Sequence, residues 1–300
     1  MNDIITEIQS KIKSKIFINY SMSKSTWFRT GGKASGYTII NNIKDLKIIT
    51  SYRDRIKLYV VGVGSNLLVR DNGFDGIIIR LGKSFNKIKI RNNNLIVGTS
   101  VLDLNLAKFA LKNSIKDFEF FRGIPGSVGG AIKMNAGCYG HQTADNLKKI
   151  LVLDKNGEFK KIKIDDLHLG YRSSRINDEC IILQAYFNFQ FGAKEEILNK
   201  FNDIQIKRES SQPIKEKTSG STFKNPINKF AAELIEKSGC KNLRVGGAVV
   251  SEIHSNFIIN KYNATSEDIE NLGKQIIKKV KKNFGISLEW EIKIIGNENK

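Results

Sequence analysis

The sequence predicts an α+β protein, because strand-type runs and amphipathic helix-type runs occupy separate stretches of the chain. Strand-type runs dominate Lys57–Leu81, where Gly, Ser, Asn and Asp separate three apolar segments. Helix-type periodicity is clearest in the stretches 193–210 and 265–285. The texture changes near Gly192, so we expect a separate C-terminal domain after that point.

Length and composition predict a globular protein with two or three domains. The chain has 300 residues, of which 40% are hydrophobic and 26% charged, so several buried cores are possible. No apolar run approaches the about 20 residues that cross a bilayer. The N-terminal stretch interleaves charged residues with Ile instead of building the core of a signal peptide. We therefore expect a cytoplasmic protein without a membrane segment.

The cysteines and histidines argue against a disulfide framework and against a metal centre. Cys138, Cys180 and Cys240 are odd in number and far apart, and no CxxC spacing occurs. The three histidines are equally scattered, and the chain has no HExxH motif. We expect no bound metal.

The net charge of +19 raises the question of a nucleic-acid partner. The lysines are spread over the whole length, however, and no RNP, zinc-finger or helix-turn-helix pattern accompanies them. A solvated lysine surface with a site for anionic ligands explains the charge better, and nucleic-acid binding is the second interpretation. The expected partners are small molecules, and neither nucleic acid nor membrane.

The stretch up to Ile16 predicts a short amphipathic helix with Ile residues on one face and Asn2 or Asp3 as its cap. A turn with a cation and two glycines follows at 29–32, before a strand at Tyr37–Ile40. Without further context, this turn indicates a simple loop.

The segment Lys57–Leu81 predicts three strands joined by two glycine-containing turns. A Rossmann motif is excluded, because the third glycine of GxGxxG would fall at Leu67 and the following residues have a strand pattern. A P-loop is also excluded, because GKS at 82–84 lies one residue too far from Gly76 and a strand intervenes. The remaining strand–turn–strand unit offers Ser, Asn and amide groups to a pyrophosphate.

Alternation predicts further strands at 87–97, 148–164 and 180–191, the second of them a hairpin around Lys155-Asn156-Gly157. Between the first two lies a predicted helix with Thr99 or Ser100 as its cap.

The C-terminal part predicts two helices and a final strand. One helix ends at Gly239, and the other begins with a Thr265 cap and ends at Gly285. The last alternating stretch, 286–296, is a predicted strand.

The stretch Phe118–Gly140 is the centre of the predicted site, because its six glycines are too dense for an ordinary helix or strand. Glycine permits positive φ and lacks a Cβ, so a turn that also contains Pro125 and Ser127 presents its backbone to a neighbour. Exposed amide groups in such a turn suit phosphate oxygens. The alternative is a tight turn between two closely packed elements, and this stretch alone does not decide between them.

The order of six motifs is more specific than any one of them. They are GSNLLV at 64–69, GIPGSVGGAIKMNAGCYG at 123–140, GYRSS at 170–174, SGSTFKNP at 219–226, a VGGA…H.NFI.N run at 245–260 and LEWEIKIIG at 288–296. In these motifs, and over nearly the whole chain from Thr26 to Gly296, the sequence resembles the UDP-N-acetylenolpyruvoylglucosamine reductase family, also called UDP-N-acetylmuramate dehydrogenase.

This resemblance implies a flavoenzyme of peptidoglycan precursor synthesis. It implies FAD as the cofactor, NADPH as the hydride donor, and reduction of UDP-N-acetylglucosamine enolpyruvate to UDP-N-acetylmuramate. The implied architecture is an FAD-binding fold of the p-cresol methylhydroxylase type in two subdomains, 1–85 and 86–195. A UDP-sugar-binding α+β domain, 196–300, follows, with its C-terminal strand returning to the active site. The chain's length is similar to that of the subclass without an inserted substrate loop.

The resemblance also assigns the glycine turns to the FAD pyrophosphate. The residues that it implies are Arg29, Thr30, Gly31, Gly62, Gly64, Ser65, Asn66, Leu67, Gly123, Ile124, Pro125, Gly126, Ser127, Gly129 and Gly130.

Three residues match the catalytic positions of the family. Arg172 is expected to grip the substrate carboxylate in a fork and to stabilise the developing enolate. Ser221 matches the proton donor, a role that suits a weakly acidic hydroxyl only because the carbanion-like intermediate is a strong base. Glu291 matches the catalytic glutamate, although alternation alone does not separate it from Glu289.

Tyr171, Lys224 and Asn225 are the expected substrate contacts. Each motif also has a plainer interpretation, with Arg172 as a surface loop residue, Tyr171 as a structural aromatic and the Ser/Thr-rich loop without chemistry. His254 is interpreted as a core or turn histidine, and nothing indicates that Cys138 reacts. Another oxidase or dehydrogenase on the same flavin fold would explain the glycine turns, but not SGSTFKNP and LEWEIKIIG together.

Overall fold

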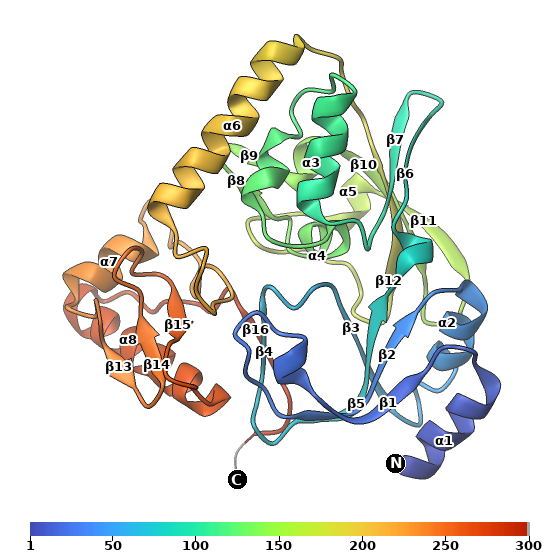
Figure 1. The fold of residues 1–300 in the computed structure, drawn as a ribbon, viewed down its shortest axis with the longest axis horizontal. Coiled ribbons are helices and arrows are strands. Elements are labelled where there is room, and N and C mark those ends of the chain that lie inside the picture. The colour runs from blue at the N-terminus through green and yellow to red at the C-terminus, as the bar shows by residue number, and fades with distance from the viewer. Residues whose placement is uncertain (299–300) are drawn as a thin grey trace. The chain divides into compact units, whose positions relative to one another are not determined.

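The computed structural model describes residues 1–298 and contains both helices and strands throughout (Figure 1). The chain forms two compact units, each built from segments that are separated in the sequence. Unit 1 consists of Met1–Phe17, Gly36–Gly62 and Gly76–Lys207. Unit 2 consists of Ile18–Ser35, Val63–Asp75 and the described residues 208–298. The domain boundaries expected at 85/86 and 195/196 stay predictions.

A four-stranded sheet has the order β1-β2-β5-β3. Its strands are β1 (Ile16–Ser21), β2 (Lys33–Ile40), β5 (Phe74–Leu81) and β3 (Lys57–Val61). β3 and β5 are parallel, with Tyr59 opposite Ile78. The helices α1 (Asn2–Lys11) and α2 (Ile43–Thr50) contribute Ile5, Ile8, Leu46 and Ile49 to the buried cluster of this region. The isoleucine pattern at the N-terminus therefore folds as the predicted amphipathic helix.

A five-stranded antiparallel sheet lies in unit 1, in the order β11-β10-β12-β7-β6. The strands are β6 (Ile88–Arg91), β7 (Asn94–Gly98), β10 (Leu147–Leu153), β11 (Phe159–Lys163) and β12 (Ile181–Phe187). β10 and β11 pair from Lys149 opposite Lys163 to Leu153 opposite Phe159. Gly157, in the connecting turn, has φ +78°, which glycine adopts without strain. The predicted hairpin is confirmed.

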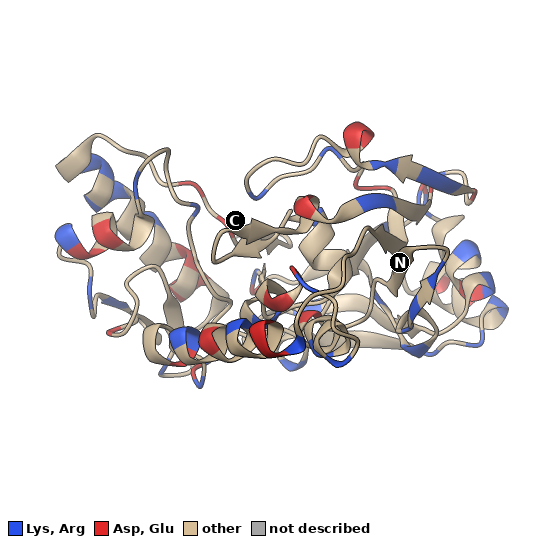
Figure 2. Ribbon diagram, turned by 90° about the horizontal axis from the view of Figure 1, so that it is seen from above, with Lys and Arg blue, Asp and Glu red and all other residues tan. Residues whose placement is uncertain are grey.

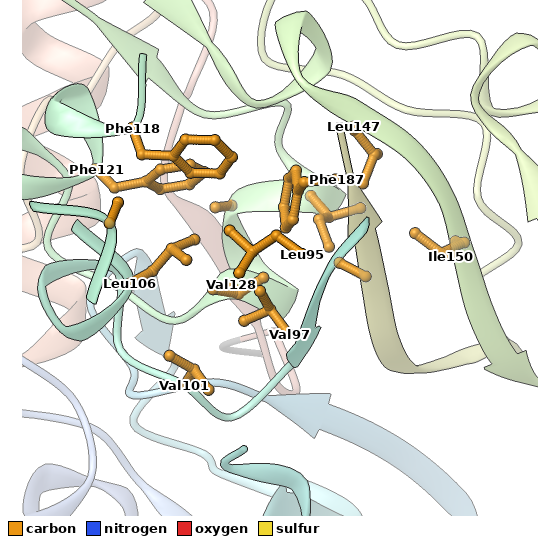
Figure 3. Packing of buried hydrophobic residues seen from close by; sticks show 14 of the residues in the cluster. Leu95, Val97, Val101, Leu106, Phe118, Phe121, Val128, Leu147, Ile150 and Phe187 are labelled. Atoms are coloured by element: carbon orange, nitrogen blue, oxygen red, sulfur yellow. The ribbon is translucent and has the colours of Figure 1, made fainter. Parts of the chain in front are cut away.

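One face of this sheet carries the main core of unit 1. α3 (Asp103–Lys112), the 3-10 helix η3 (Glu119–Gly123) and α4 (Val128–Lys133) pack against it (Figure 3). The ring centroids of Phe118 and Phe121 lie 6.0 Å apart, and Phe187 meets Phe118 edge-on at 5.6 Å. Truncating one such buried ring to Ala costs about 3–5 kcal/mol. The rings of Phe118 and Phe121 therefore anchor the start of the glycine-rich stretch.

Short elements complete unit 1, namely the 3-10 helices η2 (Lys83–Phe85) and η4 (Thr143–Asp145), the strands β8 (Gly137–Cys138) and β9 (His141–Gln142), and the helix α5 (Ile164–Leu167). The long helix α6 (Lys194–Ser211) agrees with the predicted helix at 193–210.

Two helix caps differ from the sequence predictions. α1 begins after Met1, so Asn2 and Asp3 lie inside the helix and no side chain caps it. α3 begins after Leu102, so neither predicted cap is in place. Thr99 donates its hydroxyl to the Ile182 carbonyl at 2.7 Å, and Ser100 donates to the Gly82 carbonyl at 2.9 Å. Thr99 bonds to strand β12 through both its hydroxyl and its N–H, so its side chain is not available to cap α3.

Unit 2 contains α7 (Ala231–Lys237), α8 (Ser266–Phe284), the 3-10 helix η1 (Met22–Lys24) and two small sheets. The sheets are β13-β14-β15, with β13 (Arg244–Val245), β14 (Ala248–Val250) and β15 (Ile258–Asn260), and β16-β4, with β16 (Lys293–Ile295) and β4 (Leu67–Val69). The Thr265 hydroxyl accepts the Asp268 N–H, and Gly285 ends α8 with φ +70°. Both predicted ends of this helix are confirmed.

The expected strand at 286–296 is shorter than predicted. Only Lys293–Ile295 forms a strand, which pairs in parallel with β4, with Ile294 opposite Leu68. Trp290, earlier in the stretch, forms an isolated antiparallel bridge with Phe223. The chain changes partner between these two points, so one continuous strand does not form.

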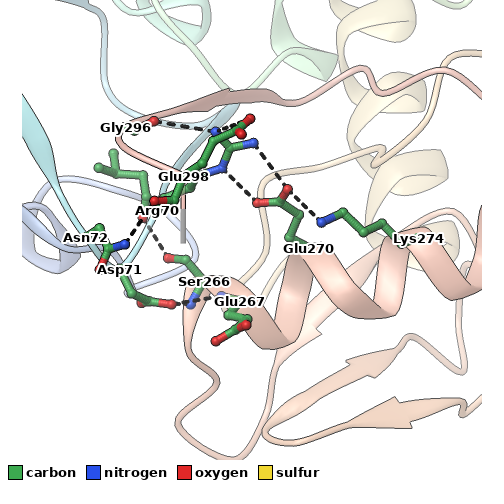
Figure 4. Close-up of polar contacts among 10 residues, drawn as sticks. Arg70, Asp71, Asn72, Ser266, Glu267, Glu270, Lys274, Gly296 and Glu298 are labelled. Carbon is green, nitrogen blue, oxygen red and sulfur yellow. Dashed lines mark hydrogen bonds and ion pairs between the residues drawn. The ribbon is translucent and has the colours of Figure 1, made fainter. Parts of the chain in front are cut away.

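A polar network joins the segment after β4 to α8 (Figure 4). Arg70 contacts Glu270 through two hydrogen bonds of 3.0 and 3.2 Å. Asp71 accepts the N–H groups of Ser266 and Glu267 at 3.0 and 2.9 Å. A carboxylate at the N-terminal end of a helix accepts hydrogen bonds from unpaired N–H groups and interacts favourably with the helix dipole. An N-terminal segment is thus an integral part of unit 2.

Candidate active site

The glycine-rich loop is held by the segment that precedes α3. The Asp103 N–H donates to the Gly126 carbonyl at 3.1 Å, and the Val128 N–H donates to Val101 at 2.9 Å. The Gly129 N–H donates to the Thr99 carbonyl, also at 2.9 Å. Two of the amide groups that the sequence offered to a phosphate are therefore used inside the protein.

Two other glycines lie beside the Ser127 hydroxyl, and one of them, Gly130, leaves open space. A Cβ added to Gly130 would meet only the Ser127 hydroxyl, at 3.9 Å, and within the described chain the Gly130 N–H donates to no other group. A Cβ added to Gly62 would lie 2.5 Å from the Ser127 hydroxyl. The structure thus brings Gly62, Ser127 and Gly130 together, with backbone that a ligand can approach. Gly123, Ile124 and Pro125 form the turn that leads into this group.

The GSN turn lies in unit 2 and is fixed on both sides. Gly64 has φ +69°, and a Cβ there would collide with the Ser25 carbonyl. Its own carbonyl accepts the Trp27 N–H at 3.0 Å. The turn ends in β4, where Leu67 lies opposite Lys293. Ser65 is half-buried between these fixed points.

The turn at Arg29–Gly31 also lies in unit 2. Arg29 has φ +55° and an exposed side chain, whereas Thr30 is buried. The Thr26 hydroxyl donates to the Thr30 carbonyl at 2.7 Å. Gly31 has φ +138°, so this turn needs glycine for its backbone conformation.

Arg172 occupies the corner of a tight turn in unit 1. Gly170 and Ser173 exchange two backbone hydrogen bonds, and Arg172 has φ +51°. Its guanidinium donates to the Gly137 carbonyl at 2.9 Å and lies 5.0 Å from the Tyr171 ring centre. The buried side chain of Asn135 donates to the Gly170 carbonyl at 3.0 Å. The structure thus ties the GYRSS turn to the end of the glycine-rich stretch.

Ser221 and Glu291 lie on adjoining backbone segments in unit 2. The Glu291 N–H donates to the carbonyl of Thr222, the residue after Ser221, at 2.9 Å. Asn66 donates from its side-chain amide to the Glu291 carbonyl at 3.1 Å. Ser221 follows Gly220, which has φ +78° and open space around its Cα. A residue from the GSN turn, one from SGSTFKNP and one from LEWEIKIIG therefore meet.

The two glutamates of LEWEIKIIG have different surroundings. Glu289 pairs with Lys224 at 3.1 Å, and its side chain is 74% exposed. Glu291 is half-buried beside the backbone that follows Ser221. This contrast favours Glu291 as the residue of the site, a choice that alternation in the sequence leaves open. Asn225 accepts the Ala231 N–H at 2.9 Å with its side-chain oxygen.

The predicted site residues form two groups, one in each unit. Unit 1 holds Gly62, the loop 123–130 and the turn with Tyr171 and Arg172. Unit 2 holds the turns at 29–31 and 64–67 together with Ser221, Lys224, Asn225 and Glu291.

Sequence reasoning missed the buried asparagines that hold these backbones. Asn135 and Asn256 are 1% and 3% exposed. Their side chains bond to the backbone of Gly170 and Phe223, each two residues from a predicted catalytic residue. Both lie in motifs that the sequence displays, MNAGCYG and HSNFIIN. Burying a polar side chain costs free energy unless it forms hydrogen bonds. An Asn within an apolar run therefore indicates a buried side chain that bonds to nearby groups, and this signal was present in the sequence.

His254 fits the interpretation of a turn histidine. Its ring meets Phe257 edge-on at 4.6 Å, and its Nδ1 accepts the Asn256 N–H at 3.3 Å. Burial lowers the pKa of His254, which favours the neutral ring that can accept this hydrogen bond.

No cluster of His, Cys, Asp and Glu suited to a metal ion occurs within residues 1–298. In the same part of the chain, no helix is long and apolar enough to span a membrane. The three cysteines are free thiols. Lys and Arg occur on helices and strands along the whole ribbon, in no single cluster (Figure 2).

Comparison with protein families defines the class first. Residues 36–163 match the family model of an FAD binding domain, and residues 212–295 match the C-terminal domain of UDP-N-acetylenolpyruvoylglucosamine reductase. These matches, together with the fold, define an FAD-dependent oxidoreductase. The chain is 43% identical to the UDP-N-acetylenolpyruvoylglucosamine reductase of Rickettsia typhi over 95% of its length and 97% of that protein. It belongs to the UDP-N-acetylenolpyruvoylglucosamine reductase family.

Other relatives agree. The reductase of Rickettsia prowazekii is 42% identical over the same shares of both chains. The crystal structure of the Thermus caldophilus reductase superposes with a TM-score of 0.82 at 32% identity, covering 94% of this chain and 98% of the other. The expected fold is confirmed, namely an FAD-binding fold of the p-cresol methylhydroxylase type and an α+β C-terminal domain.

Proposed function

We propose that this protein uses NADPH to reduce UDP-N-acetylglucosamine enolpyruvate to UDP-N-acetylmuramate, a step of peptidoglycan precursor synthesis. The observation that carries the proposal is that Glu291 contacts both Asn66 and Thr222, the residue after Ser221, in a chain of this family. We also propose that the reaction takes place in the cytoplasm.

The residues present fit an FAD pyrophosphate. Within the described residues, the Gly130 N–H has no hydrogen-bond partner, and open space and the Ser127 hydroxyl lie next to Gly130. Gly62 lies on the other side of that hydroxyl. We assign the loop 123–130 and the turns at 29–31 and 62–67 to cofactor binding. FAD held by these residues would supply the hydride chemistry, with NADPH as the donor and the terminal carbon of the enolpyruvyl group as the acceptor. The protein's own residues must hold the reacting carbon in place, stabilise the negative charge that develops, and donate a proton.

Arg172 binds the carboxylate of the enolpyruvyl group in this proposal. Hydride addition leaves negative charge on the adjacent carbon and on that carboxylate, and a guanidinium stabilises it through a fork of hydrogen bonds. The fixed turn with φ +51° and the contact with Gly137 restrict the arginine before substrate arrives. Preorganisation of this kind reduces the cost of orienting a catalytic group.

Ser221 donates the proton that completes the reduction. Its O–H bond breaks as a C–H bond forms at the carbon next to the carboxylate, and water then restores the proton to the serine oxygen. Glu291 steers this proton or polarises the substrate carboxyl group, from a position that Thr222 links to Ser221. Tyr171, Lys224 and Asn225 contact the UDP-sugar.

Replacement of Ser221 by Ala tests the central assignment. Flavin reduction by NADPH should change less than about twofold, whereas reoxidation by the enolpyruvyl substrate should fall by about 10² or more, as expected for loss of a general acid. Stopped-flow absorbance measures the two half-reactions separately. Equal loss of both half-reactions would show that Ser221 supports the fold or the flavin and not the proton transfer.

A further inference from the structure

The backbone that follows Ser221 is gripped by one side chain. The Phe223 N–H donates to Asn256 Oδ1 at 3.0 Å, and Asn256 Nδ2 donates back to the Phe223 carbonyl at 2.8 Å. The Asn256 main-chain carbonyl accepts the Thr222 N–H at 2.7 Å. The asparagine therefore pairs with both polar groups of Phe223, as a neighbouring strand would.

On their other side, Thr222 and Phe223 contact residues 290–291. The Thr222 carbonyl accepts the Glu291 N–H at 2.9 Å, and Phe223 forms an isolated antiparallel β-bridge with Trp290. Residues 222 and 223 thus lie between Asn256 on one side and 290–291 on the other. Fixing this short segment fixes the backbone beside both Ser221 and Glu291.

Asn256 is itself rigid. It is 3% exposed and belongs to a turn in which the Ser251 hydroxyl accepts the N–H groups of Ile253 and His254 at 3.1 and 3.3 Å. The Ser251 N–H closes the turn on the Phe257 carbonyl at 2.8 Å. Asn256 Nδ2 can only donate and Asn256 Oδ1 can only accept. Only one orientation of the side-chain amide therefore forms both hydrogen bonds with Phe223.

Gly220, directly before Ser221, is less constrained, although Thr218 and Ser219 are buried and the Lys217 carbonyl accepts the Asn260 N–H at 2.9 Å. Gly220 has φ +78°, and nothing would contact a Cβ there within 4 Å. A proton donor must lie within hydrogen-bond reach of the atom that it protonates, and a displacement of about 1 Å costs up to about 10² in rate. Because Gly220 lies between Ser221 and the buried residues before it, residues 222 and 223 are the paired backbone nearest to the Ser221 hydroxyl.

We propose that Asn256 is a positioning residue for Ser221, acting through the paired backbone of Phe223. The inference rests on the proposed function, since it concerns the proton donor of that reaction. Asn256 takes no part in the chemistry itself; it holds the serine hydroxyl at the distance that proton transfer requires.

The test replaces Asn256 by Asp, which keeps the acceptor for the Phe223 N–H but places a second oxygen against the Phe223 carbonyl. Reoxidation of the reduced holoenzyme by the enolpyruvyl substrate should slow by about tenfold or more. Flavin reduction by NADPH should stay within about twofold of wild type. The solvent deuterium isotope effect on reoxidation should rise, because proton transfer limits the rate more strongly. A loss of stability alone does not raise that isotope effect.

Asn256→Ser is the second variant, since it removes the pairing without adding a charge, and the same rise in isotope effect is expected. Asn260→Asp is the matched control. Asn260 is 4% exposed and also bonds to backbone on both sides, donating to Phe28 at 2.8 Å and accepting from Ala264 at 2.6 Å. It should lose stability and keep the wild-type isotope effect. An isotope effect that rises equally in Asn260→Asp would overturn the proposal.

A double variant separates this inference from the proposed function. If Asn256 acts through Ser221, Ser221→Ala/Asn256→Asp reoxidises no more slowly than Ser221→Ala alone, because the two changes remove the same step. If the double variant's loss in reoxidation rate equals the product of the two single losses, Asn256 does not act through Ser221. If Ser221→Ala alone leaves reoxidation intact, the proton donor of the proposed function is wrong. If Ser221→Ala blocks reoxidation while Asn256→Asp matches wild type, only the positioning role fails.

Discussion

Asp103 carries a fully buried carboxyl group in the first turn of α3. Neither of its oxygens has a hydrogen-bond partner within the described chain, and burial raises its pKa well above the usual range. An unpaired carboxylate in such a place loses its hydration without compensation, so the neutral acid is the stable form in the folded protein.

This pKa makes stability depend on pH. Asp103 in the unfolded chain loses its proton near pH 4, whereas folded Asp103 keeps it to a higher pH, so its contribution to stability decreases as the pH rises above about 4. In Asp103→Asn this group no longer titrates. The melting temperature of the variant, relative to wild type, should therefore increase between pH 5 and pH 8.

Thermal unfolding followed by circular dichroism at several pH values measures this difference. Asp54→Asn, which removes an exposed carboxylate, is the control for the loss of one negative charge. A constant offset between Asp103→Asn and wild type across this range would show that Asp103 does not titrate differently on folding.

The residue types of the candidate site were predictable, but their surroundings were not. Arg172, Ser221 and Glu291 stand out because ordered motifs contain them. The pairing of Glu289 with Lys224, which separates the two glutamates, depends on a bridge between Phe223 and Trp290. Residues more than 60 positions apart in sequence meet there, and local alternation carries no information about such contacts.

At the scale of elements, α8 shows two opposing effects at one glycine. Gly273 lies in the middle of the helix, where glycine costs about 1 kcal/mol relative to Ala. A Cβ at this position, however, would overlap the ring of Trp290. Overpacking of a filled core typically costs about 1–3 kcal/mol. Because the contact involves a bulky ring that also packs on Phe223, with centroids 5.0 Å apart, we expect the packing cost to dominate.

Gly273→Ala should therefore destabilise the protein by about 1–2 kcal/mol, although helix propensity alone predicts stabilisation. Denaturant unfolding measures the difference. Lys278→Ala, on the exposed face of the same helix, is the control and should change stability by less than about 0.5 kcal/mol. A more stable Gly273→Ala would show that Trp290 moves aside without cost.

Helices with complete local signals were predictable from the sequence. α8 has both its cap and its terminal glycine, and the β10–β11 hairpin has its turn glycine. The caps of α1 and α3 were wrong for a physical reason. Thr99 was a good candidate by type, but its hydroxyl and carbonyl bond to Ile182 and Gly129. A cap forms only where the side chain has no stronger partner, and that partner comes from a distant segment.

At the scale of the whole molecule, each compact unit is assembled from segments far apart in the chain. β4 and the Asp71 turn fold with α8 and β16, although almost 200 residues separate Asp71 from Ser266. Hydrophobic periodicity is a local property and predicts the elements, not this assembly. The family resemblance supplied the architecture, because ordered motifs record contacts that periodicity does not.

The most direct test of the account is a visible absorption spectrum of the purified protein, recorded before and after anaerobic NADPH and again after UDP-N-acetylglucosamine enolpyruvate. The account predicts an oxidised flavin spectrum that NADPH bleaches and that the enolpyruvyl substrate restores. A flavin that remains bleached after the substrate is added would contradict the proposed acceptor. A protein that binds no flavin after reconstitution with FAD would contradict the site assigned to the glycine turns.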